Sequence, residues 1–161
     1  MMKKIFIFLI IIISLLFVLP VVLILIGAFT EPIRRENYYS EKDHYVNEFG
    51  VVTRFEYYGK NNDKLYIYVK NELYIKEGKA PPDTTYTTKI VIVGNNLNYL
   101  KDNGIDEKIK LGSFIEFATV QKNFGYARPI VSLTVDGEVL LEFEDGYANL
   151  LEWLQSGGLK R

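Results

Sequence analysis

The chain has 161 residues, with 19 basic and 20 acidic side chains, one histidine, no cysteine and 12 tyrosines. The lack of cysteine excludes a disulfide framework, and a single histidine leaves little from which to build a zinc site or a charge-relay triad. We therefore expect no metal, no cofactor and no catalytic residue.

Residues 5–28 are uncharged and almost entirely apolar, and they follow Lys3 and Lys4 directly. A helix over this run spans about 36 Å, enough to cross a hydrocarbon core of about 30 Å with some tilt. A cleaved signal peptide has a shorter apolar region, of roughly 7 to 15 residues, and small residues before the cut. We predict an uncleaved transmembrane helix over residues 5–29, with a cleaved export signal as the alternative.

This region contains two prolines, Pro20 and Pro32. Pro20 predicts a kink that does not end the helix, because apolar residues resume at once. The polar and helix-breaking segment Thr30-Glu31-Pro32 predicts the end of the helix.

Basic residues stand on both sides of the apolar run, so the positive-inside rule decides little about orientation. The short basic start resembles a secretory signal, and a chain without cysteine suits an exported domain. We expect a single-pass protein of the cell membrane with this order: residues 1–4 cytoplasmic, residues 5–29 transmembrane, residues 30–44 a juxtamembrane stalk, and residues 45–161 an extracellular β-rich domain.

The first 30 residues take Lys3 and Lys4 from the 19 basic side chains and none of the 20 acidic ones, leaving 17 against 20, a net charge of −3. A negative domain is a poor partner for a phosphate backbone, so we do not expect nucleic-acid binding. All 12 tyrosines lie in this part of the chain, which is typical of a folded domain and not of a disordered one.

Beyond residue 44 the apolar residues mostly recur with a period of two, which predicts strands. The predicted strands are 45–58, 65–70, 87–93, 114–121, 130–135 and 139–143. The apolar residues Phe49, Val51, Phe55 and Tyr57 are predicted to share one face of the first strand, and Gly50 predicts a bulge or bend within it.

Turn and helix signals separate these strands. Residues 59–63 predict a turn, residues 76–85 a loop, and Asp136-Gly137 a hairpin. A short helix is expected over residues 97–101, capped by Asn95 or Asn96 and ended by Gly104. Residues 145–155 predict an amphipathic helix, because apolar residues recur at helical spacing, with Asp145 as its cap.

This order of elements over residues 45–143 resembles the OB-fold, a five-stranded Greek-key barrel with a helix between its third and fourth strands. We therefore expect a mainly β fold with minor α: a small OB-like Greek-key barrel, plus a C-terminal amphipathic helix, preceded by one transmembrane helix. The additional strand over residues 139–143 and the last helix depart from the minimal pattern. A different small β-barrel or a β-sandwich is the alternative.

The resemblance implies a binding platform on the outer face of the second and third strands. Tyr66 and Tyr68 would stand on that face, with Tyr74 and Tyr86 beside the following loop. These four tyrosines are the candidate ligand-binding residues. The alternative is that they pack beneath the loop or against the last helix.

We expect a non-catalytic, membrane-anchored extracellular domain that binds an envelope component or a partner protein. One alternative is an enzyme acting on envelope glycans through carboxylates, for which Glu142 and Glu144 on one strand face, or Asp106 and Glu107, are the candidates. A second is an OB-type nucleic-acid binder, against which the net charge of the domain counts.

Overall fold

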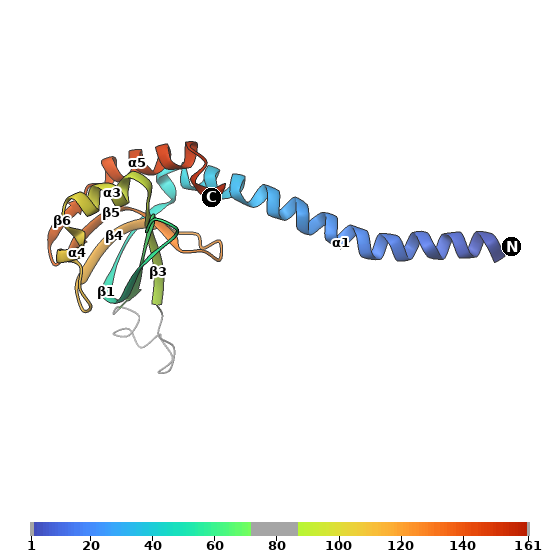
Figure 1. Cartoon of the computed structure of the whole chain (residues 1–161), viewed down its shortest axis with the longest axis horizontal. Helices are drawn as coiled ribbons and strands as arrows, with labels where there is room; N and C mark the ends of the chain where they lie inside the picture. The colour runs from blue at the N-terminus through green and yellow to red at the C-terminus, as the bar shows by residue number, and fades with distance from the viewer. Residues whose placement is uncertain (1, 72–86, 161) are drawn as a thin grey trace. The chain divides into compact units, whose positions relative to one another are not determined.

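A computed structural model describes the backbone of residues 2–71 and 87–160 and the side chains of residues 16–71 and 87–159. The chain divides into two compact units, Met1–Asn37 and Tyr38–Arg161 (Figure 1). The first unit is helical and the second is a β-sheet domain with helices.

The N-terminal unit belongs to a single helix, α1 (Met2–Tyr39). The side chains of residues 16–30 are all exposed, although most of them are apolar. Within the described side chains, Leu16–Tyr39 is the one helix long and apolar enough to cross a membrane. A signal sequence meets the same criteria, so α1 is an apolar helix of the kind that serves as a membrane anchor or an export signal.

The predicted end of this helix at Thr30-Glu31-Pro32 is wrong, because α1 continues through both prolines to Tyr39. Proline removes one hydrogen-bond donor, and the following residues Arg34, Arg35 and Glu36 include good helix formers that resume the turn. The hydroxyl of Thr30 donates to the carbonyl oxygen of Ile26 at 2.9 Å, a side-chain bond that runs along the helix.

The described residues contain one sheet of six strands: β1 (Tyr45–Tyr58), β2 (Lys64–Lys70), β3 (Thr87–Val93), β4 (Phe114–Val120), β5 (Arg128–Val135) and β6 (Glu138–Leu141). Their order is β3-β2-β1-β4-β5-β6, with antiparallel neighbours throughout. A short parallel pairing of Ile90 with Arg128 and of Val91 with Pro129 joins β3 to β5. The sheet therefore closes partly into a ring. All six predicted strands are confirmed, with bounds that differ by two residues at most.

The prediction that Phe49, Val51, Phe55 and Tyr57 share one face of β1 is wrong for the first two of these residues. The pairing of β1 with β2 shifts between Val52 and Arg54, so one extra residue in β1 reverses the alternation of side chains. Val52 therefore lies in the core with Phe55 and Tyr57. The other two predicted residues are not in that core, and Phe49 packs against Phe114 with ring centroids 5.9 Å apart.

Gly50 is not at this shift, which comes a few residues later. A Cβ atom at Gly50 would lie 2.4 Å from the carbonyl oxygen of Lys70 in β2. Glycine is required here because the two backbones approach too closely for a side chain.

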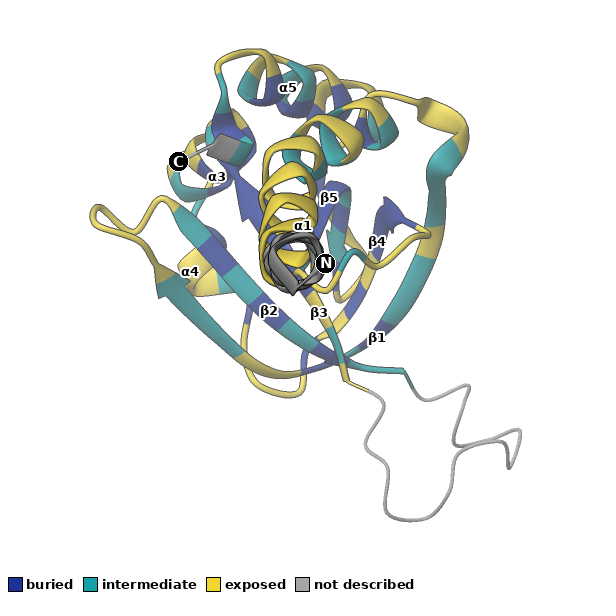
Figure 2. Cartoon of the chain, turned by 90° about the vertical axis from the view of Figure 1, so that its right-hand side faces the viewer, coloured by how far each residue is buried: buried dark blue, intermediate teal, exposed yellow. Residues whose placement is uncertain are grey.

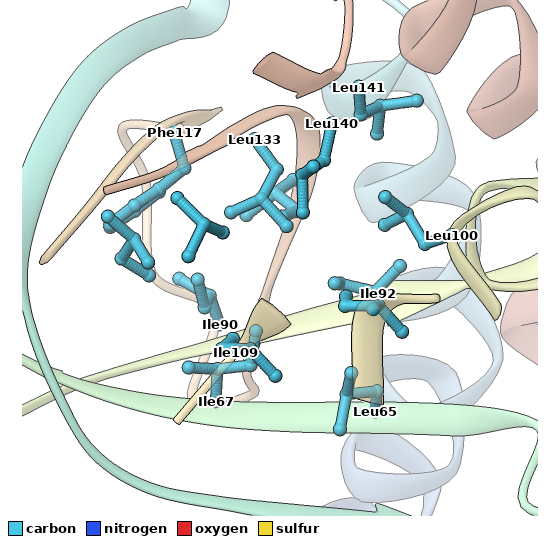
Figure 3. Packing of buried hydrophobic residues seen from close by; sticks show 14 of the residues in the cluster. Leu65, Ile67, Ile90, Ile92, Leu100, Ile109, Phe117, Leu133, Leu140 and Leu141 are labelled. Atoms are coloured by element: carbon cyan, nitrogen blue, oxygen red, sulfur yellow. The ribbon is translucent and has the colours of Figure 1, made fainter. Parts of the chain in front are cut away.

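The main core lies inside the ring and takes residues from all six strands, from α3 (Gly94–Asp102) and from α4 (Ile105–Lys108) (Figure 3). The predicted helix over residues 97–101 is thus confirmed, and it begins three residues earlier. The predicted asparagine cap is wrong, because Val93 occupies the cap position and forms no side-chain cap bond. Asn96 is buried instead, and its Nδ2 donates to the carbonyl oxygen of Gly146 at 2.8 Å.

The last helix, α5 (Phe143–Gln155), covers the outer face of β3, β4 and β5 (Figure 1). A second apolar cluster fills this interface and comprises Tyr39, Val91, Val93, Ala118, Val120, Val131, Tyr147, Leu150 and Leu154. The predicted helix is confirmed, but Glu142 stands at its cap position and Asp145 lies in its first turn, so the predicted cap is wrong. Short 3-10 turns are formed by Lys42–His44 and Gly158–Lys160.

The Asp136-Gly137 hairpin joins β5 to β6 as predicted. Both residues have positive φ angles, 49° and 87°, as a tight two-residue turn of this kind requires. The Asp136 carboxylate accepts a hydrogen bond from the backbone N–H of Phe114 at 2.8 Å, which ties the turn to the start of β4.

Candidate functional site

The candidate site is the outer face of β1, β2 and β3. Leu65, Ile67 and Val69 are buried in the main core, so Tyr66 and Tyr68 lie on the opposite face, as the alternation predicts. Figure 2 shows the resulting alternation of buried and half-buried bands along β2. We call this surface the tyrosine face and define it by Arg54, Glu56, Tyr58, Tyr66, Tyr68 and Lys89. The other two candidate tyrosines, Tyr74 and Tyr86, lie outside the described residues.

The centre of the tyrosine face is a row of three side chains that crosses three strands. Arg54 of β1 is paired with Tyr68 of β2, and Tyr68 is paired with Lys89 of β3. The guanidinium of Arg54 is 5.1 Å and the ammonium of Lys89 is 5.3 Å from the Tyr68 ring centroid. Both distances are within the range of cation–π attraction, so the ring interacts with a cation from each neighbouring strand.

A second pair of rings extends the face. Lys89 Nζ is only 3.9 Å from the centroid of the Tyr66 ring, and the Tyr58 and Tyr66 ring centroids are 5.8 Å apart. Tyr58 is 62% exposed, whereas Tyr66 is half-buried and packs on the second apolar cluster beneath α5. Tyr66 is therefore partly a packing residue, and Tyr58 is the ring most open to solvent.

Glu56 accepts hydrogen bonds from two side chains of the tyrosine face, Tyr68 and Arg54. One carboxylate oxygen accepts a hydrogen bond from the Tyr68 hydroxyl at 2.8 Å, and the other accepts one from the Arg54 guanidinium. The hydrogen bond from Tyr68, followed by the interaction with Arg54, lowers the pKa of Glu56 below its ordinary value. The carboxylate is therefore charged at neutral pH and orients both Tyr68 and Arg54.

Replacing Tyr68 with Phe should raise the pKa of Glu56, because the largest cause of its lowering is removed while the ring is kept. A carboxyl group with a lowered pKa stabilises the fold above its unfolded-state pKa, and that contribution is lost as the pH falls through the folded-state value. Carbon-detected NMR titration of the Glu56 carboxyl group measures the shift. Tyr58→Phe is the control, and an equal pKa in Tyr68→Phe and wild type would refute the hydrogen bond.

One of the two carboxylate pairs considered for an enzyme is not arranged as predicted. Glu142 and Glu144 do not share a strand face, because Glu142 caps α5 and Glu144 lies in its first turn, paired with Lys42. Asp106 in α4 accepts a hydrogen bond from the Tyr57 hydroxyl. Burial, followed by this hydrogen bond, raises the pKa of Tyr57, so the phenol stays neutral. Within the described residues, no group of three or more His, Asp or Glu side chains is placed to hold a metal ion.

His44 is less solvated than its polar surroundings in the sequence suggest, since its side chain is 29% exposed. Its ring stacks on Tyr38 with centroids 3.7 Å apart, and its Nδ1 is 2.8 Å from the Tyr38 carbonyl oxygen. Next to it, Tyr45 donates its hydroxyl to the Tyr39 carbonyl oxygen at 2.8 Å. Burial raises the pKa of Tyr45, which fixes it as a neutral donor. The contacts of His44 and Tyr45 with Tyr38 and Tyr39 therefore stabilise the junction between the end of α1 and the start of β1.

An ion pair between Arg128 of β5 and Glu48 of β1 was not predicted from the sequence. Two guanidinium nitrogens of Arg128 lie 2.7 Å from the two carboxylate oxygens of Glu48, and Nη1 also donates to the Val120 carbonyl oxygen at 3.1 Å. Arg128 is only 9% exposed. No local pattern connects two residues 80 positions apart, so only the folded chain reveals this pair.

No family model, curated protein or solved structure matches the chain.

Proposed function

We propose that this chain is a non-catalytic binding protein held at the outer surface of the cell membrane by α1, with a domain that binds an envelope component through the tyrosine face. The observation that carries the proposal is the face itself, where three tyrosine rings from two strands lie beside two cations. Tyrosine rings and cations held side by side on a rigid sheet suit contact with ring-shaped or charged ligands.

We further propose that the domain is an OB-like barrel. Three features support this: β1 is long and pairs with both β2 and β4, α3 follows β3, and β3 pairs in parallel with β5. In OB-folds the face of the second and third strands is the usual binding surface for oligonucleotides and oligosaccharides. The tyrosine face occupies the corresponding strands.

The outward orientation is tested by protease added to intact protoplasts. Because we place residues 38–161 outside the cell, the protease should digest the domain without lysis, and an epitope tag at the N-terminus should be protected. A cytoplasmic marker protein serves as the control for intact membranes. Digestion of the domain only after lysis would reverse the orientation.

The binding role is tested with the full-length protein in detergent micelles, sedimented with the insoluble envelope fraction. Replacing Tyr58 with Ala and Tyr68 with Leu in one variant should weaken the affinity for the envelope fraction at least about tenfold, because stacking contributes about 1–3 kcal/mol per ring. The matched control is Tyr99→Ala, which removes an exposed tyrosine on α3, away from the face. If the face variant and the control sediment like wild type, the tyrosine face is not the binding site.

A further inference from the structure

Two further lysines lie beside the tyrosine face and add to its positive charge. Lys64 and Lys70 belong to the same side of β2 as Tyr66 and Tyr68, because the residues between them point into the core. Together with Arg54 and Lys89 they place four cations on this side of the sheet. Within the described residues of the three strands, Glu56 is the one acid on that side, and it already binds Arg54.

This local excess opposes the charge of the protein as a whole. The chain has a net charge of −1, and residues 31–161 have a net charge of −3. A positive surface on a negative domain focuses attraction on one place, and it favours an anionic ligand there while the remainder of the surface repels it. Charge complementarity therefore points to an anion as the occupant of the face.

The dimensions of the face fit a polymer. Lys64 and Lys70 stand at the two ends of β2, six residues apart, or about 20 Å at about 3.3 Å per residue. The rings of Tyr66 and Tyr68 lie between them along the strand, and Lys89 lies over both rings. Two neighbouring rings thus lie between a cation at each end of the strand, with a third cation over them, which suits a chain that carries both rings and charged groups.

We propose that the ligand of the tyrosine face is an acidic polysaccharide, whose sugar rings stack on Tyr58, Tyr66 and Tyr68 and whose carboxylates bind Lys64, Lys70 and Lys89. This inference rests on the proposed binding function and names its ligand class. Lys89 has a double role: without ligand its ammonium covers the rings of Tyr66 and Tyr68, and with ligand it turns to a carboxylate and uncovers them.

The test uses the full-length protein in micelles of a zwitterionic detergent and two polymers with the same sugar backbone, polygalacturonate and its fully methyl-esterified form. Polygalacturonate should bind at least about tenfold more tightly, because only it carries charge, and added salt should weaken its binding. Lys89→Gln should lower the affinity for polygalacturonate about tenfold. Lys110→Gln, which removes an exposed lysine outside the three strands, should leave it unchanged.

Three outcomes would overturn the inference. Equal binding of the two polymers would mean that charge is not recognised, and tighter binding of a single-stranded oligonucleotide than of polygalacturonate would assign the face to nucleic acid. Binding of neither polymer, by a protein that still sediments with envelopes through the tyrosine face, would leave the proposed function standing without this ligand class. Envelope binding that does not depend on the face would remove the proposed function itself.

Discussion

Replacing Glu48 with Ala should lower the free energy of unfolding by about 3 kcal/mol, because it removes the partner of the buried Arg128 guanidinium and leaves that charge without compensation. Among the described residues, Arg128 would keep its hydrogen bond to the Val120 carbonyl oxygen. Thermal unfolding of the full-length protein in micelles, followed by the near-ultraviolet circular dichroism of its many tyrosines, measures the loss.

The location of Arg128 explains why this effect should be among the largest. Its backbone pairs with Ile90 where β3 meets β5, so the charge lies at the point where the sheet closes on itself. Glu116→Ala, which removes an exposed glutamate from β4, is the matched control. Glu48→Leu combined with Arg128→Leu should recover much of the stability, since no charged side chain of the pair is then left without its partner. A single Glu48→Ala variant as stable as the Glu116→Ala control would contradict this account.

Replacing Leu150 with Ala should destabilise the domain by about 2–5 kcal/mol, the usual range for a fully buried leucine. Leu150 is 1% exposed in the interface between α5 and the sheet, whereas its neighbour Leu151 is only half-buried and should cost less. Gln155→Ala, at the exposed end of the same helix, is the control. The melting temperature is the measured quantity.

The close approach of α5 to the sheet supports this expectation. A Cβ atom at Gly146 would lie 2.0 Å from the carbonyl oxygen of Val131 in β5, so the helix backbone rests directly on the strand. A helix in such contact cannot leave without exposing the whole second cluster. If Leu150→Ala melts at the wild-type temperature, α5 is not docked in solution and would be available to a partner.

Only part of the candidate site could be predicted from the sequence. The alternation of β2 placed Tyr66 and Tyr68 on one face, because that alternation is a local property of a strand with one side buried. Their partners could not be predicted. Without the shift after Val52, Thr53 would stand opposite Tyr68, and it is the extra residue that brings Arg54 there instead.

By itself the sequence determined the elements: the apolar helix at the N-terminus, the six strands, the hairpin at Asp136-Gly137 and the apolar stripe of α5. These depend on periodicity and turn residues within a few positions of one another. Only the tertiary structure decided the inner face of β1, the pairing of β3 with β5 and the ion pair of Glu48 with Arg128. Each of these depends on which residues of distant segments meet, and that is set by strand register and by packing between elements, which leave no trace in any local stretch of the chain.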